Sequence, residues 1–176
     1  MGEEWKGGDM AHPGGGYKIN LLKEELANHK DNKNLVIMFT DSYDVLLLAG
    51  KDEILKKFKN FEANVVFGAE DFCWPDQSLK EKYPKVDRGY RFLNSGGFIG
   101  YAPDLYKIVT QVPVADTDDD QLFYTKIFLN DELREQYKIK LDNRAEIFQN
   151  LNGAVCKFFG KSSTSFNVKS FCRRCV

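Results

Sequence analysis

Apolar residues along this chain alternate between strand-like runs and helix-like stripes. Residues 35–40 form an unbroken apolar run of strand length, and residues 65–67 and 92–101 supply further apolar segments, the last broken by two glycines. Between these runs, apolar positions recur at the spacing of one helix face. Such alternation predicts an α/β fold, a mostly parallel sheet with helices on both faces. The helix stripes are Ile19, Leu21, Leu22 and Leu26; Ile54, Leu55, Phe58 and Phe61; and Leu105, Ile108, Val109 and Val112.

Two carboxylates, Asp41 and Asp44, directly follow the first apolar run. In open α/β sheets, ligands bind outside the carboxyl ends of the strands, and hard carboxylate oxygens suit Mg²⁺ or Mn²⁺. The pattern therefore predicts a divalent cation held against a phosphorylated substrate. The alternative is a pair of turn acids that cap the next segment.

A second acidic group, four aspartates within residues 116–120, stands just before an apolar helix pattern. Acids at this place are favoured by the helix dipole and by capping. Four of them exceed what capping requires, and their mutual repulsion suggests a cation, sugar hydroxyls or a carboxylate acting in group transfer. Both interpretations stay open at this point.

Aromatic and small residues mark further candidate contacts. Trp5, Tyr43 and Trp74 can stack on a base or a sugar, although a single aromatic is more often part of a core. The triple glycine 14–16, ahead of the first helix, can bring bare amides to a phosphate or serve as a plain helix entry. Asn94, before two glycines, can hydrogen-bond a sugar or mark a tight bend.

Composition narrows the class of protein. The 176 residues are 43% hydrophobic and 29% charged, which fits one globular domain. A net charge of −1 without a long basic block argues against a nucleic-acid partner. No apolar stretch approaches a membrane span, and residues 1–5 lack the features of a secretory signal.

The last part of the chain, residues 156–176, is basic and shows no apolar period, so we expect an irregular tail. Cys172 and Cys175 have the two-residue gap of zinc sites. Because no second Cys or His pair lies at a ligand spacing, a frayed basic terminus is the preferred interpretation.

Several strings, taken together and in order, closely resemble the N-terminal glycosyltransferase domain of the procollagen lysyl hydroxylases. The resemblance covers nearly everything from residue 2 to about residue 155, which predicts a partial glycosyltransferase domain at 1–155 and a divergent tail at 156–176. The strings are GEEWKGGD (2–9), FTDSYDV (39–45), FLNSGGFIG (92–100), DDDQLFY (118–124) and IFQNLNGA (147–154).

The resemblance implies a GT-A type fold that uses Mn²⁺ and a UDP-sugar. It implies transfer of a sugar, glucose above all, to galactosyl-hydroxylysine of collagen, in the lumen of the endoplasmic reticulum. By motif, it implies metal ligands at Asp41 and Asp44, sugar-nucleotide contacts at Trp5, Lys18, Tyr43, Trp74 and Asn94, and catalytic acids at Asp119 and Asp120.

The chain also departs from the family pattern. Against that pattern, we expect the chain to start inside the domain, after the signal peptide and the first strand-helix unit, and to lack the later His-Gly-Asn-Gly segment that should supply a third metal ligand. We likewise expect it to lack the hydroxylase domain, which uses Fe²⁺ and 2-oxoglutarate. An alternative expectation is therefore an inactive truncated fragment, or a non-catalytic module that binds collagen or a full-length family member.

Overall fold

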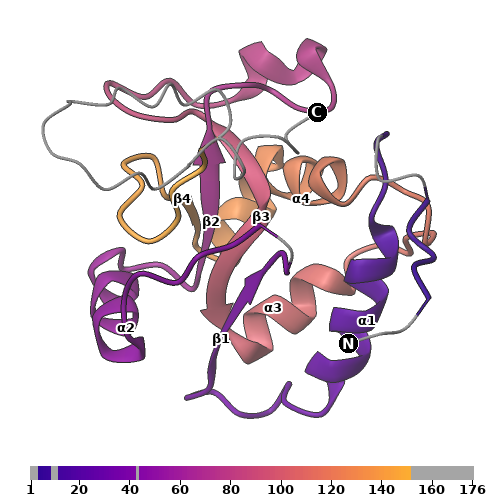
Figure 1. Ribbon diagram of the computed structural model, residues 1–176, viewed down its shortest axis with the longest axis horizontal. Helices are drawn as coiled ribbons and strands as arrows, with labels where there is room; N and C mark the ends of the chain where they lie inside the picture. Colours follow the sequence, from indigo (N-terminus) through magenta and orange to yellow (C-terminus); the bar gives the residue numbers. More distant parts are fainter. Residues whose placement is uncertain (1–3, 9–11, 43, 152–176) are drawn as a thin grey trace, which may run out of the picture.

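The computed structural model describes residues 4–8, 12–42 and 44–151, and Figure 1 shows their arrangement. Up to residue 129, the α-helices and strands follow the order that the apolar pattern predicts, whereas the helix at 131–136 and the strand at 139–141 were not predicted. The strands are β1 (Val36–Thr40), β2 (Val65–Glu70), β3 (Phe92–Tyr101) and β4 (Ile139–Leu141). The helices are α1 (Gly16–Ala27), α2 (Lys51–Asn60), α3 (Ala102–Val109), α4 (Asp120–Leu129) and α5 (Asp131–Gln136), with a 3₁₀ helix η1 (Gln77–Lys82).

The strands pair in the order β1-β3-β2-β4. Strand β4 runs parallel to β2, whereas β3 runs antiparallel to both of its neighbours. The expectation of a mostly parallel sheet is therefore corrected to a mixed sheet, in which β1, β2 and β4 share a direction that β3 reverses. The reason is the connection from β2 to β3, which contains only the short η1; strands joined without a helical crossover can run antiparallel.

Helices cover both faces of the sheet, as predicted. Figure 1 shows α1, α3 and α4 on one side and α2 on the other. The alternation of side chains along β2 accounts for this layering, since Val65 and Phe67 join the core under α1, α3 and α4, while Val66 joins Phe58 of α2. The fold is a three-layer α/β arrangement.

The larger core is built around Phe98 of β3, which is 1% exposed. Its ring stacks on Phe39 with centroids 4.8 Å apart, and it lies 5.0 Å from Phe67 and 5.3 Å from Tyr124. One side chain thus joins β1, β2 and α4. Burial of aromatic rings in such clusters is a main source of stability.

Strand β1 is less buried than its unbroken apolar run would suggest, because all five of its residues are only half-buried. It lies at the edge of the described sheet and pairs there only with β3. Edge strands lack a neighbour on one side, which leaves their side chains partly accessible. Three consecutive leucines after β1, Leu46–Leu48, are exposed as well.

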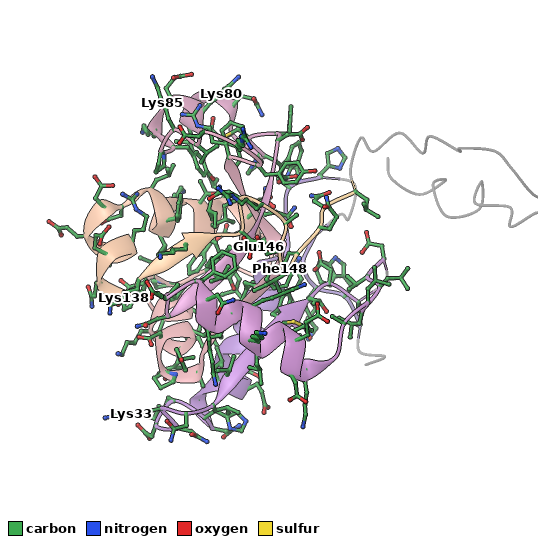
Figure 2. All side chains as sticks on the ribbon, turned by 90° about the vertical axis from the view of Figure 1, so that its left-hand side faces the viewer. Lys33, Lys80, Lys85, Lys138, Glu146 and Phe148 are labelled. Carbon is green, nitrogen blue, oxygen red and sulfur yellow. The ribbon has the colours of Figure 1, made fainter. Side chains whose placement is uncertain are left out.

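A loop that follows β4 covers part of the α2 face. The buried carboxylate of Asp142 accepts hydrogen bonds from the amides of Glu146, Ile147 and Phe148, at 2.8, 2.7 and 2.8 Å. Figure 2 shows Glu146 and Phe148 in the middle of this face, next to α2. The Phe148 ring lies against Gly97, where a Cβ would approach it to 2.6 Å. Gly97 therefore makes room for the ring.

Strands β2 and β3 pair in two registers. Phe67 lies opposite Phe98, but the next residue, Gly68, lies opposite Asn94. Residues 95–97 of β3 are thus unmatched on β2, and they form a bulge directed toward the end of β1. This irregularity brings polar residues to the carboxyl end of β1.

Within the part of the chain that the structure describes, no helix is both long and apolar enough to cross a membrane. Cys172, Cys175 and the rest of the expected tail lie outside the described residues.

Candidate functional site

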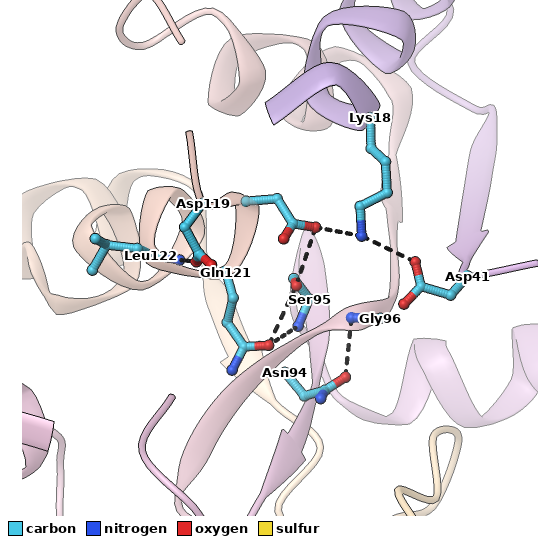
Figure 3. Close-up of polar contacts among 9 residues, drawn as sticks. Lys18, Asp41, Asn94, Ser95, Gly96, Asp119, Gln121 and Leu122 are labelled. Carbon is cyan, nitrogen blue, oxygen red and sulfur yellow. Dashed lines mark hydrogen bonds and ion pairs between the residues drawn. The ribbon is translucent and has the colours of Figure 1, made fainter. Parts of the chain in front are cut away.

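Three charged side chains from distant parts of the sequence meet beyond the carboxyl end of β1. The Lys18 ammonium lies 2.7 Å from the Asp120 Oδ2 atom and 3.1 Å from the Asp41 Oδ1 atom (Figure 3). Lys18 belongs to α1, Asp41 follows β1, and Asp120 begins α4. The structure therefore brings Asp41, from the first acidic pair, and Asp120, from the acidic run, to one place, with Lys18 between them.

Backbone hydrogen bonds fix the two helices that carry Lys18 and Asp120. The amides of Gly16 and Tyr17 donate to the carbonyls of Asp118 and Asp116, at 2.7 and 2.9 Å, and the Asp120 amide donates to Gly14 at 3.0 Å. The start of α1 is thus docked against the start of α4. Lys18, in the first turn of α1, consequently faces the first residue of α4.

The glycines before α1 serve this docking. The amides of Gly15 and Gly16 are bonded to the carbonyls of Gly7 and Asp118, so they are not bare donors for a phosphate. Gly15 has a φ of 100°, a conformation that glycine adopts without the steric cost other residues incur. Of the two interpretations of the triple glycine, the structure favours the helix entry.

Asp41 is placed by the bulge of β3. Its amide donates to the Gly96 carbonyl at 2.9 Å, and a Cβ on Gly96 would lie 3.0 Å from the Asp41 Oδ2 atom. The Gly96 amide in turn donates to the Asn94 Oδ1 atom at 3.0 Å. Asn94 therefore stabilises the bend, and the bend admits the carboxylate.

Burial and charge act against each other in this cluster. Burial disfavours the ammonium of Lys18, but Asp120 and Asp41 outweigh it and raise the pKa of Lys18 above its usual value. Burial also raises the pKa of Asp41, against the opposing effect of Lys18. An additional cation or hydrogen-bond donor near this partly buried carboxylate would therefore stabilise its charged form.

A chain of polar side chains extends inward from Asp120. Ser95 Oγ donates to the Asp120 Oδ2 atom at 3.3 Å, and the Ser95 amide donates to Gln121 Oε1 at 3.1 Å. Gln121 Nε2 donates to Glu70 Oε1 at 2.6 Å, and Asn150 donates to the other oxygen of Glu70 at 3.3 Å. The network links β2, β3, α4 and the loop after β4.

Glu70 is the acid of this network that the sequence interpretation missed. It is 7% exposed and ends β2. The rule that singled out Asp41, an acid at the carboxyl end of an apolar strand, applies to it as well. Burial raises the pKa of Glu70 above its usual value, although bonds from Gln121 and Asn94 oppose the shift.

Glu70→Gln should make the stability difference between the two proteins depend on pH. Because the folded pKa lies above the ordinary 4.5, the native state holds this proton more tightly than the unfolded state, and the wild type loses stability as pH rises through the folded pKa. The free energy of unfolding of the variant, relative to the wild type, should therefore increase between pH 4 and pH 7. Urea titrations at both pH values measure this difference.

The matched control is Glu53→Gln on the surface of α2. The Glu53 carboxylate pairs with Lys57, and that contact lowers its pKa, so the relative stability of this variant should not increase with pH. A Glu70→Gln difference that is the same at pH 4 and pH 7 would contradict the prediction.

Three of the four aspartates of the acidic run have structural roles. Asp119 is the N-cap of α4, its Oδ1 accepting from the Leu122 amide at 2.6 Å. Asp118 accepts from the Ala115 amide, and Asp116 accepts from the Asn20 side chain. Capping and turn formation thus account for Asp116, Asp118 and Asp119. Asp120 is the member that faces the site.

The predicted sugar-nucleotide residues are distributed around this cluster. Trp5 is 40% exposed, donates to the Gly8 carbonyl at 2.6 Å and meets Tyr17 edge-on, with ring centroids 6.0 Å apart. It therefore lies beside the start of α1. Trp74 is 43% exposed, and its carbonyl accepts from Gln121 at 3.3 Å, which places it beside the inner network.

Asp44 is exposed, yet its charge contributes to raising the pKa of Asp41. The two predicted metal acids are therefore electrostatically coupled. Tyr43, the remaining predicted contact, lies outside the described residues.

The donor set can be compared with what Mn²⁺ requires. Asp41 and Asp44 offer hard oxygen atoms, which fit a divalent cation. Among the described residues, no group of three or more His, Cys, Asp or Glu side chains is gathered as a metal site. The residues present thus fit an ion that keeps waters or substrate oxygens, and they do not form an all-protein cage.

A family model and several known proteins relate this chain to the same family. The family model described as "PLOD GT domain" matches residues 1–169. The chain belongs to this family. It is 57% identical over 156 residues to procollagen-lysine,2-oxoglutarate 5-dioxygenase 1 of Gallus gallus. It is 52% identical over the same length to the multifunctional procollagen lysine hydroxylase and glycosyltransferase LH3 of Rattus norvegicus, and 52% identical over 155 residues to the Drosophila melanogaster dioxygenase.

These alignments cover 88% of the chain but 21% of each relative. The chain thus spans about a fifth of the length of the relatives it matches. The mixed α/β fold agrees with membership of this glycosyltransferase family. The boundary expected near residue 155 stays a prediction, because residues 152–176 are not described.

Proposed function

We propose that this chain forms a metal-dependent glycosyltransferase domain that transfers a sugar, glucose above all, from a UDP-sugar to galactosyl-hydroxylysine of collagen. The observation that supports this most directly is the convergence of Lys18, Asp41 and Asp120 at the carboxyl end of β1, in a chain of the PLOD GT family. One rat relative carries both hydroxylase and glycosyltransferase in its name. The hydroxylase chemistry, with Fe²⁺ and 2-oxoglutarate, is not proposed for this chain.

The residues divide the work by their chemistry. Asp41 and Asp44 would hold Mn²⁺, which when bound supplies positive charge to the departing diphosphate. Lys18 would bind a diphosphate oxygen, since its flexible stem carries a point charge. The amides of Gly15 and Gly16 already donate to backbone carbonyls, which supports Lys18 as the group that would hold the phosphate.

On the sugar side, Asp120 would face the reacting groups, and Asp119, the N-cap of α4, keeps the start of that helix in place. Trp5 and Trp74, both partly exposed, offer faces for the base or the sugar, and Tyr43 is proposed with them. The hydrogen bond from Gln121 to the Trp74 carbonyl ties this aromatic residue to the polar network. The domain would act in the lumen of the endoplasmic reticulum.

One observation favours a second function, a non-catalytic module that binds collagen or a full-length family member. Within the described residues, Asp41 and Asp44 are not joined by a third side chain of the metal-ligating types. A site with so few protein ligands depends on substrate oxygens to retain its cation.

Calorimetric titration of the purified chain with UDP, with and without Mn²⁺, separates the two functions. We expect saturable UDP binding that requires Mn²⁺, and uridine, which has no diphosphate, should not show this requirement. Equal heats with and without the metal, from a chain shown to be folded by circular dichroism, would exclude the enzymatic proposal in favour of the binding module.

A further inference from the structure

The ammonium of Lys18 lies between two carboxylates that belong to the proposed site. It is 2.7 Å from Asp120 and 3.1 Å from Asp41, and its side chain is 26% exposed (Figure 3). Lys18 thus occupies the side of Asp41 that faces Asp120. An ammonium in this position competes with any other cation for the Asp41 carboxylate.

The backbone leaves room for this bridge at both ends. A Cβ on Gly15 would lie 3.0 Å from both Asp120 Oδ1 and Lys18 Cε, and a Cβ on Gly96 would lie 3.0 Å from Asp41 Oδ2. These distances are shorter than ordinary contacts of a Cβ, so a larger residue at either position would press on the bridge. Gly15 and Gly96 therefore leave the space that the bridge occupies.

The flexible part of the arrangement is the lysine itself. The Asp120 amide donates a hydrogen bond to the Gly14 carbonyl, and the Asp120 carboxylate accepts one from the Ser95 hydroxyl. The Asp41 amide donates a hydrogen bond to the Gly96 carbonyl. The start of α1 is docked on the acidic segment. A lysine stem can change rotamer without moving any of these backbone segments.

We propose that Lys18 is a placeholder cation that occupies Asp41 until a nucleotide diphosphate draws it away, so that the diphosphate opens Asp41 to the metal. This rests on the proposed function. The physical basis is repulsion, since an ammonium and a divalent cation on the same carboxylate are both positive and only a few ångströms apart. An anionic diphosphate, in contrast, attracts both.

This arrangement predicts opposite effects of one substitution on two ligands. Lys18→Met keeps the length and apolar stem of the side chain but removes the charge. The affinity for Mn²⁺ alone should rise about tenfold, because the competing charge is gone. The affinity for UDP at saturating Mn²⁺ should fall about tenfold, because a cation that binds phosphate is lost. A residue that only binds phosphate would not change the affinity for the metal alone.

Two further variants complete the experiment, which follows Mn²⁺ binding by calorimetry and by the loss of the free-ion resonance signal. Lys23→Met removes an exposed charge from the same helix and should leave both affinities unchanged. Lys18→Gln removes the charge while keeping a polar end, and it should reproduce the tighter binding of Mn²⁺. Urea unfolding confirms that each protein is folded.

The outcomes distinguish this inference from the proposed function. If the wild type binds Mn²⁺ and neither Lys18 variant binds it more tightly, the placeholder role is wrong while the metal site stands. If neither the wild type nor the variants bind Mn²⁺, with or without UDP, both proposals are overturned. Tighter binding of Mn²⁺ alone, together with weaker binding of UDP, supports the placeholder.

Discussion

Asp41→Asn should reduce Mn²⁺-dependent UDP binding by at least about 100-fold, since loss of even an outer partner of a metal ligand costs 10–100-fold. Asparagine keeps the shape of the side chain and one oxygen but removes the charge that attracts the cation. The Asp41 backbone bond to Gly96 and the contact of Lys18 with Asp120 are independent of this charge. The fold should therefore survive the substitution.

The control for Asp41→Asn is the same substitution at a second aspartate, near the other end of β1, and both variants are studied by the same calorimetric titrations. Asp31 is exposed in the turn that precedes the strand, and Asp31→Asn changes the net charge by the same amount. Its UDP affinity should match that of the wild type. A loss confined to Asp41→Asn assigns the effect to the site, whereas equal affinities of the two variants would rule out Asp41 as a metal ligand.

Phe98→Ala should lower the free energy of unfolding by about 3–5 kcal/mol, the usual cost of truncating a buried phenylalanine. The ring is 1% exposed and contacts the rings of Phe39, Phe67 and Tyr124. Its removal leaves a cavity between β1, β2 and α4 that rigid aromatic neighbours cannot fill. Since domains are stable by only about 5–15 kcal/mol, much of the total stability would be lost.

Urea unfolding followed by circular dichroism measures this cost, with Phe72→Ala as the control. Phe72 follows β2 and is 50% exposed, so its truncation should change stability by less than about 0.5 kcal/mol. Similar losses for the two variants would show that the cluster around Phe98 is not the centre of the core.

The sequence predicted the elements of this fold better than their arrangement. Periodicity located strands β1, β2 and β3 and helices α1 to α4, because the buried face of an element repeats every 3.6 or 2 residues, but it did not locate the short α5 and β4. It did not reveal the direction of β3, which depends on how residues 71–91 reconnect the strands in space. Nor did it show that Leu21 and Val112, two members of apolar stripes, are 41% and 55% exposed.

For the candidate site too, the sequence predicted residues better than their arrangement in space. Local rules singled out Asp41 and the acidic run, and the resemblance added Lys18, but neither placed the ammonium between two carboxylates. That geometry arises from backbone bonds between residues 14–17 and 116–120, about a hundred positions apart in the sequence. Glu70 was missed although its position at the end of an apolar strand was available to the same rule.

The bulge of β3 separates the chemistry of this domain from its architecture. Residues 92–94 and 98–100 pair with β2 in two different registers, so the sheet holds together on either side of the three residues between them. Ser95 and Gly96 of this segment face the charged cluster. Evolution can therefore alter what these two positions contact while every pairing with β2 stays in place. A scaffold of this kind can diverge in substrate preference, or lose activity, and still remain recognisably the same fold.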